Sequence, residues 1–513
     1  MEFNEHSRKA NALLVSASGV IQQAVQVFGN FIYRTIFLMF LTKEYLGIQG
    51  LFSNILQLFS LAELGIGSAI LYSMYKPFAE HDSRKISALV RFYSKVYHLL
   101  ALLVLIMGFC FYPFIGWLVD VSEVPADVNL TVVYFLFVLQ SVVSYLFVYR
   151  QSLLSADQRN HVVSLFNCGL LLTSYVIRSI VLACTKNFEL VLLSDIVTNL
   201  VLNGLFSLWI TRRYGSVFRC KEELPREEKM AIFKNTGGLL CHKIGSVVVT
   251  STDNIVLTKF VSLVATGIYS NYATIVLAIT NLANRVLSGL IPTIANYILN
   301  KTKEESHKLF RCLLYGNLWI ASFTTVCLYL LLNPFIEVWQ DSSFLLEQSV
   351  VAWICLQHYL QVARLSSNVF ISGCGLFMRD RVRPLIESVL NIVVSVVLAQ
   401  RIGIQGVFIG TCVSGVCTYF WREPYLVFKN YFHRSQWGYW VTQAAWMLLT
   451  LAMCAAGQWL FAGISSSLAG FMCKMLIAAV VPNVLILLLT CRTEECRYFL
   501  GFANNLIRKK RGA

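Results

Sequence analysis

The sequence has few charged residues. Asp, Glu, Lys and Arg make up 13% of its 513 residues, whereas an ordinary globular chain has about 25%. A soluble protein of this length needs polar residues to cover its surface, yet 57% of this chain is hydrophobic. The composition therefore excludes an ordinary soluble protein and predicts that much of the surface faces lipid.

Other features of soluble or secreted proteins are also missing. The connections between apolar segments are short, which leaves no room for a soluble catalytic domain. The 15 cysteines include no Cys-x-x-Cys pair and mostly lie in apolar runs, which favours packing over disulfides or a metal site. The N-terminal "MEFNEHSRKANALLVS" lacks the features of a secretory signal, so we expect a retained first span.

Long apolar runs are what the sequence does contain. Leu99–Val119, Leu130–Tyr149 and Cys312–Ile336 each approach or exceed the roughly 20 residues that cross a bilayer as a helix. No dyad alternation marks them as barrel strands. The sequence predicts an all-α polytopic membrane protein with about 14 transmembrane helices. The expected spans are residues 11–41, 46–72, 96–117, 130–151, 162–184, 190–211, 235–259, 264–296, 310–333, 347–373, 385–400, 404–421, 438–460 and 469–490.

The basic residues predict the orientation. The connections between spans alternate between two sides of the membrane. The set that includes both termini holds 32 Lys and Arg, whereas the other set holds only Lys43, Lys186, Lys259 and Arg401. Because positive loops stay inside, both termini are expected in the cytoplasm. The formal charge of +15 is then explained by anionic membrane lipid as a partner, and we expect no nucleic-acid binding.

A short phrase recurs at the start of two spans. "YLGIQGLFSN" begins at Tyr45 and "TGIYSNYA" at Thr266, with Gly47 and Gly267 220 residues apart. Glycine near a helix start lets a neighbouring helix approach closely. We therefore expect two six-helix lobes in parallel pseudo-repeat, which transporters often place around a substrate site. The expected division is an N-lobe (1–215, helices 1–6), a C-lobe (216–437, helices 7–12), extra helices 13 and 14 (438–490) and a basic cytoplasmic tail (491–513).

Two stretches carry a family resemblance. "STDNIVLTKFVSLVATGIYSNYATI" (251–275) resembles the seventh and eighth helices of the polysaccharide-transport (Wzx-type) flippases, and "EYLGIQGLFSNILQLFSLAELGIGSAI" (44–70) resembles their first-to-second helix stretch. This family belongs to the multidrug/oligosaccharidyl-lipid/polysaccharide exporter superfamily. The resemblance implies a central cavity lined chiefly by helices 1, 2, 7 and 8. It also implies transfer of an undecaprenyl-diphosphate-linked oligosaccharide between leaflets, without enzymatic chemistry.

Ionisable residues inside spans are costly and therefore candidates for function. Arg178 and Asp195 are equally far from the outward turn "TKNF" and so at about equal depth, which favours a structural ion pair over substrate contact. Glu387 and Lys474 lie near span ends and are expected to reach the interface. His242 and His358 are assigned packing or interfacial roles, with proton relay as the alternative. The remaining candidates are Arg34, Glu63, Lys243, Asp253, Arg285 and Arg364.

We expect these remaining residues to line the cavity. The four cations can meet a diphosphate, because guanidinium groups offer a fork of donors to phosphate oxygens. The two carboxylates would neutralise them between visits or bind a coupling ion, H⁺ or Na⁺. Unrelated pairing within each lobe is an equally weighted alternative.

The leading functional prediction is a flippase of the bacterial inner membrane that exports a polyprenyl-diphosphate-linked glycan by alternating access, for O-antigen, capsule or exopolysaccharide. A polysaccharide polymerase or chain-length protein is a possible partner. One alternative is a cation-coupled multidrug or metabolite exporter of the same superfamily. Another is a membrane-embedded polymerase or acyltransferase, against which the lack of a large outward loop argues.

Overall fold

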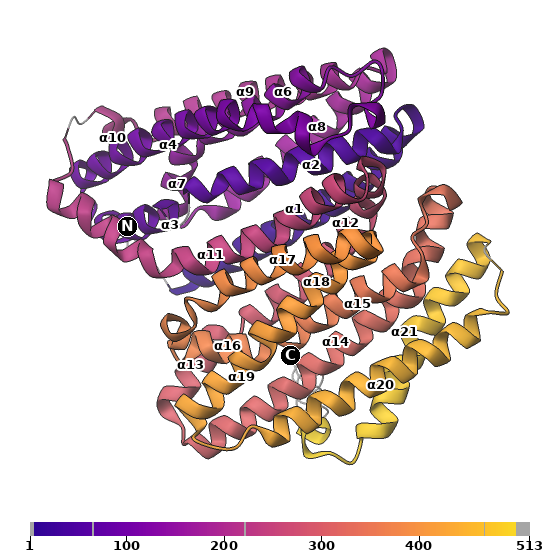
Figure 1. Cartoon of the computed structure of the whole chain (residues 1–513). Helices are drawn as coiled ribbons and strands as arrows, with labels where there is room; N and C mark the ends of the chain where they lie inside the picture. Colours follow the sequence, from indigo (N-terminus) through magenta and orange to yellow (C-terminus); the bar gives the residue numbers. More distant parts are fainter. Residues whose placement is uncertain (1–4, 64–65, 220–221, 466, 499–513) are drawn as a thin grey trace. The chain divides into compact units, whose positions relative to one another are not determined.

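A computed structural model describes residues 5–63, 66–219, 222–465 and 467–498. These residues form helices and no strand (Figure 1), so the predicted all-α class is confirmed. The chain divides into two compact units, unit 1 (Met1–Gly267) and unit 2 (Ile268–Ala513). The two units are defined by packing, and the boundary between them falls inside a helix. The predicted lobes were instead defined by the sequence repeat, with a boundary between residues 215 and 216. The lobe boundaries stay a prediction.

Unit 1 consists of long helices joined by short turns. Its α-helices are α1 (Glu5–Phe40), α2 (Lys43–Phe59), α3 (Ile66–Ala79), α4 (Ser83–Phe111), α5 (Ile115–Leu118), α6 (Leu130–Tyr145), α7 (Val148–Ala156), α8 (Asn160–Thr185), α9 (Phe188–Arg213), α10 (Gly215–Arg219) and α11 (Arg226–Phe260), and its 3₁₀ turns are η1 (Ser60–Glu63), η2 (Tyr112–Phe114) and η3 (Val121–Glu123).

Unit 2 begins within α12 and has the same character. Its α-helices are α12 (Leu263–Ser288), α13 (Ile291–Asn300), α14 (Lys303–Trp339), α15 (Gln348–Ala363), α16 (Leu365–Gly373), α17 (Arg383–Ile402), α18 (Ile404–Gly415), α19 (Trp421–Val427), α20 (Trp437–Phe461) and α21 (Leu468–Thr490). Its other turns are the 3₁₀ segments η4 (Ser342–Phe344) and η5 (Leu376–Asp380) and the π-helical segments η6 (Val416–Phe420) and η7 (Phe428–Phe432).

Every expected span falls on a helix or on consecutive helices. Within the described residues, ten such segments are long and apolar enough to cross a membrane. The four expected spans outside this set correspond to α1, α2 with α3, α11, and α15 with α16. Of these, α1 carries Gln22, Gln23 and Arg34 within its length, and the expected span 46–72 includes residues 64–65, which lie outside the described residues. A polytopic membrane protein is therefore established, while the number of crossings stays a prediction.

The sequence sets several helix ends directly. Lys186 adopts a left-handed conformation (φ 52°) after α8, and the Asn187 side chain accepts a hydrogen bond from the Leu190 N–H, which starts α9. Thr302 and Glu305 form a reciprocal capping box at the start of α14. Gly403 has a positive φ of 62° between α17 and α18, where other residues would be strained. The turns are thus encoded locally by their own residues.

Contacts between connections test the predicted alternation of sides. In unit 1, Lys95 donates to Glu223 at 2.8 Å, which joins two connections expected inside, and the hydrogen bond lowers the pKa of the Glu223 carboxyl. Tyr45 donates to Asp127 at 2.6 Å, which joins two connections expected outside. In unit 2, Arg434 contacts Glu304 at 2.9 Å, which joins two connections expected inside. Connections with the same expected side thus lie together in each unit.

Each unit has its own apolar core and an apolar outer surface. Ile48, Leu51 and Phe52 of α2 are fully buried in the core of unit 1, and Leu318 and Phe370 are fully buried in that of unit 2. Large apolar side chains are also exposed along whole helix faces, as on α21, where Leu476, Val480 and Leu488 are more than half exposed. Such continuous exposure suits contact with lipid rather than water.

Candidate functional site

A break between two helices in unit 2 positions Arg364. The residue is the C-cap of α15 and the N-cap of α16, so it lies at the junction of the two helices. Glu423 lies on the short α19, which is flanked by the π-helical segments η6 and η7. π-Helical turns often occur at functional positions because they re-aim side chains. Here the two irregular segments bring a guanidinium and a carboxylate together.

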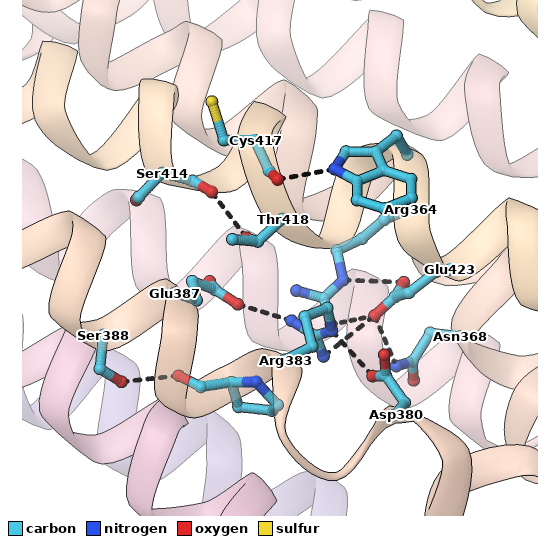
Figure 2. Close-up of polar contacts among 12 residues, drawn as sticks. Arg364, Asn368, Asp380, Arg383, Glu387, Ser388, Ser414, Cys417, Thr418 and Glu423 are labelled. Atoms are coloured by element: carbon cyan, nitrogen blue, oxygen red, sulfur yellow. Dashed lines mark hydrogen bonds and ion pairs between the residues drawn. The ribbon is translucent and has the colours of Figure 1, made fainter.

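Arg364 and Glu423 form the centre of a buried cluster of charges (Figure 2). The Nη2 and Nε atoms of Arg364 donate to the two carboxylate oxygens of Glu423, at 2.6 and 3.2 Å. The Tyr419 ring lies 4.2 Å from the guanidinium carbon of Arg364. The Glu423 side chain is completely buried and that of Arg364 is 20% exposed. This fork is the strong, bidentate form of an ion pair.

Arg383 joins the cluster from the first residue of α17. It donates to Asp380 at 2.7 Å and to Glu387 at 2.5 Å, and its third nitrogen lies 3.3 Å from Glu423. All four side chains are at most 12% exposed. Two guanidinium groups therefore face three carboxylates. The cluster ties η5, α16, α17 and α19 together.

Sequence reasoning missed most of this cluster. Glu423, Arg383 and Asp380 lie just outside the expected spans, in connections where no site residue was predicted. Glu387 is paired with Arg383 one turn earlier and is 12% exposed, and its expected position near the interface stays a prediction. Spacings of three and four residues around Arg383 are the signal that identifies this pairing. Lys474 is likewise buried, at 7% exposed, with its amine 5.9 Å from the centre of the Phe461 ring.

A second buried charge site lies in unit 1. Arg178 on α8 and Asp195 on α9 form an ion pair at 3.4 Å, with side chains 16% and 6% exposed. Asp195 also accepts from Gln140 at 2.5 Å and from Ser174. The Arg178 guanidinium lies 4.6 Å from the centre of the Tyr33 ring of α1. The structure thus brings the two residues together, and their structural role stays a prediction.

Glu63 ends a chain of hydroxyl groups in unit 1. Tyr97 donates to its carboxylate, Tyr93 donates to Tyr97 at 3.3 Å, and Ser152 donates to Tyr93 at 3.2 Å. Both tyrosines are at most 3% exposed. The carboxylate is therefore held by neutral donors of α4, within its own unit.

The other predicted site residues are placed individually. Arg34 lies half-buried on α1 and Asp253 is 5% exposed on α11, and each has an interaction partner. Arg285 is exposed in the last turn of α12. Lys243 belongs to α11, but its side chain lies outside the described residues. Arg364 already holds Glu423, which makes it the weakest candidate for diphosphate. All these roles stay predictions.

The repeated glycines make a close helix contact. A β-carbon on Gly47 would overlap the carbonyl oxygen of Leu263, and one on Gly267 would overlap that of Lys43. The starts of α2 and α12 therefore touch through backbone atoms, as the recurring phrase predicts.

Comparison with known families decides the assignment. Residues 9–298, more than half of the chain, match the family described as "Polysaccharide biosynthesis protein". The chain belongs to this family. The match spans unit 1 and the start of unit 2, including both glycine phrases. A comparison of this chain with curated proteins finds no match.

Solved structures show the fold of this family member. The lipid II flippase MurJ, in an inward closed conformation, is similar with a TM-score of 0.64 and 14% identity over 94% of this chain and 98% of that one. A multidrug resistance MATE transporter of the MOP superfamily is similar with a TM-score of 0.58 and 12% identity over 80% and 98%. A point mutant of the Vibrio cholerae MATE transporter VcmN gives 0.52 and 13% over 83% and 98%. The chain therefore has the fold that this flippase and these transporters share.

Proposed function

We propose that the chain is a flippase that moves an undecaprenyl-diphosphate-linked oligosaccharide across the bacterial inner membrane by alternating access. The glycan then serves lipopolysaccharide O-antigen, capsule or exopolysaccharide synthesis. The observation that carries this proposal is membership of the polysaccharide biosynthesis family in a chain whose described residues include ten segments long and apolar enough to cross a membrane. Likeness to a lipid II flippase over 94% of the chain supports it.

The cations inside helices suit an anionic head group. Arg34 and Arg285 lie on α1 and α12, and a charge that faced lipid would be far costlier than one that faces a wet cavity. We assign them to the diphosphate and assign no covalent chemistry to the chain. Both termini are cytoplasmic in this proposal, and either H⁺ or Na⁺ drives the cycle. Anionic lipids contact the basic inner connections, and a polymerase or chain-length protein receives the product.

A cation-coupled multidrug or metabolite exporter is the second candidate, because MATE transporters share the fold. Coverage separates the two candidates: the MATE structures match 80% and 83% of this chain, against 94% for MurJ. The predicted site residues also include more cations than carboxylates, which suits an anionic substrate better than an organic cation.

Deletion and complementation test the proposal. In a strain deleted for this gene, lectin binding to surface glycan should fall and polyprenyl-linked glycan should accumulate inside. The wild-type gene should restore export, Arg285→Lys should restore it partly because the charge remains, and Arg285→Ala should restore little. Membrane protein level is measured in parallel. Normal surface glycan in the deletion strain, with reduced efflux of ethidium, would support the exporter instead.

A further inference from the structure

His358 is buried at the meeting point of three helices in unit 2. It lies on α15, is 1% exposed, and has a threonine hydroxyl on each ring nitrogen. The Thr280 oxygen on α12 is 2.8 Å from Nδ1, and the Thr324 oxygen on α14 is 2.8 Å from Nε2. Both nitrogens are therefore engaged by groups that can donate or accept.

Each threonine hydroxyl is also bonded to its own helix. Thr280 donates to the carbonyl of Val276 at 2.8 Å, and Thr324 donates to that of Ile320 at 2.8 Å. A hydroxyl has one hydrogen, so a hydroxyl that donates to its helix can only accept from the imidazole. Both ring nitrogens must then carry hydrogen for all four contacts to be hydrogen bonds.

Counting hydrogens shows what the site lacks. The four contacts need four hydrogens, of which the two hydroxyls supply two. Neutral imidazole supplies one more and leaves one contact without a hydrogen, whereas imidazolium supplies two and completes the set. We propose that His358, Thr280 and Thr324 form a proton-binding site, in which the bound proton is held on the imidazole.

The helices around His358 carry no charged side chain close to the site along their sequence, so a proton on the imidazole is the charge that the site can gain. α14 has no charged residue between Arg311 and Glu337, and α18, which packs on α15, has none at all. The nearest charges along α12 and α15 are Arg285 and Arg364, and Arg364 is held by Glu423. The titratable side chains on the neighbouring turns are neutral thiols and a phenol, Cys327, Cys355, Tyr359 and Cys412.

Occupancy of the site changes backbone bonding. When the proton leaves, one hydroxyl must turn from its carbonyl to the bare ring nitrogen, which leaves that carbonyl of α12 or α14 with the helix N–H as its hydrogen-bond donor. Threonine bonds to the preceding turn bend helices, so proton loss alters the bend of the helix concerned. This site stands on its own contacts and does not depend on which substrate the chain carries.

Nitrogen NMR of the whole protein tests the proposal. Full-length protein labelled with ¹⁵N in its histidine rings is placed in nanodiscs and titrated from pH 4 to 9. The His358 signals are identified by their loss in His358→Gln. Two protonated nitrogens should convert to one protonated and one bare nitrogen as pH rises. If His358→Gln does not fold, the signals that both Thr280→Val and Thr324→Val displace provide the assignment.

The threonines supply matched variants. Thr280→Val removes an acceptor for the imidazolium N–H at nearly constant shape, so the titration midpoint should fall by about one to two pH units. Thr280→Ser keeps the hydroxyl and should keep the midpoint. A neutral ring throughout the range, equal midpoints for Thr280→Val and Thr280→Ser, or no signal moved by the valine variants would overturn the proposal.

Discussion

Replacing Arg383 by glutamine should sharply reduce the stability of unit 2. The change keeps much of the side-chain length but removes one of the two guanidinium groups that face Asp380, Glu387 and Glu423. One guanidinium, that of Arg364, then faces three carboxylates. Glu387, whose side chain is 12% exposed, would lose its direct ion-pair partner and keep only Arg364, which is already bound to Glu423.

The size of the effect follows from burial. Removing one partner of a buried ion pair costs about 3–5 kcal/mol, because the remaining charge keeps its desolvation penalty. Arg383 lies within 3.3 Å of three carboxylates, so we expect at least the lower value. Adding Glu387→Gln to Arg383→Gln removes one unpaired carboxylate and should restore part of the loss.

Thermal unfolding of the tagged full-length protein, followed by fluorescence size-exclusion, measures the effect. Arg381→Gln is the matched control, because Arg381 is exposed two residues away and its loss should change stability by no more than about 0.5 kcal/mol. The reasoning is refuted if Arg383→Gln and Arg381→Gln unfold at the same temperature. It also fails if the double variant is less stable than Arg383→Gln alone.

Three further outcomes are expected. Arg178→Ala or Asp195→Ala should lower the amount of folded protein, and exchanging the two residues should restore part of it; normal levels with lost transport would indicate a substrate role instead. Gly267→Ala should destabilise by roughly 1–3 kcal/mol through overlap with backbone, whereas Gly204→Ala, with open space around it, should not; equal melting of the two variants would contradict this. In a cysteine-free background, an impermeant thiol reagent should label Ser122→Cys but not Ser216→Cys in intact cells, and the reverse pattern would invert the topology.

Local rules explain what the sequence predicted well. The contact between Arg178 and Asp195 follows from their equal distance to the turn at Lys186, because two helices leaving one turn run side by side. The close approach at Gly47 follows from the missing side chain in the same way. Both inferences need only helix geometry and one nearby turn.

The cluster around Glu423 needed information that the sequence does not display locally. Arg364 and Glu423 are separated by 59 positions and meet because α15 ends at Arg364 and π-helical turns flank α19. Hydropathy does not register such breaks, so α15 with α16 was predicted as one span. The hydroxyls on His358 come from two other helices, 78 and 34 positions away. Tertiary packing decided these pairings.

The glycine contact at the starts of α2 and α12 has a symmetry of its own. Gly47 meets Leu263 and Gly267 meets Lys43, and each partner is displaced from its counterpart by the same 220 positions. In the predicted repeat, Gly47 touches the second-copy counterpart of Lys43, and the counterpart of Gly47 touches Lys43 itself, as in an isologous interface of a two-fold dimer. A half-length chain that paired with itself would have this contact available, and fusing two such copies end to end would preserve it without any new residue.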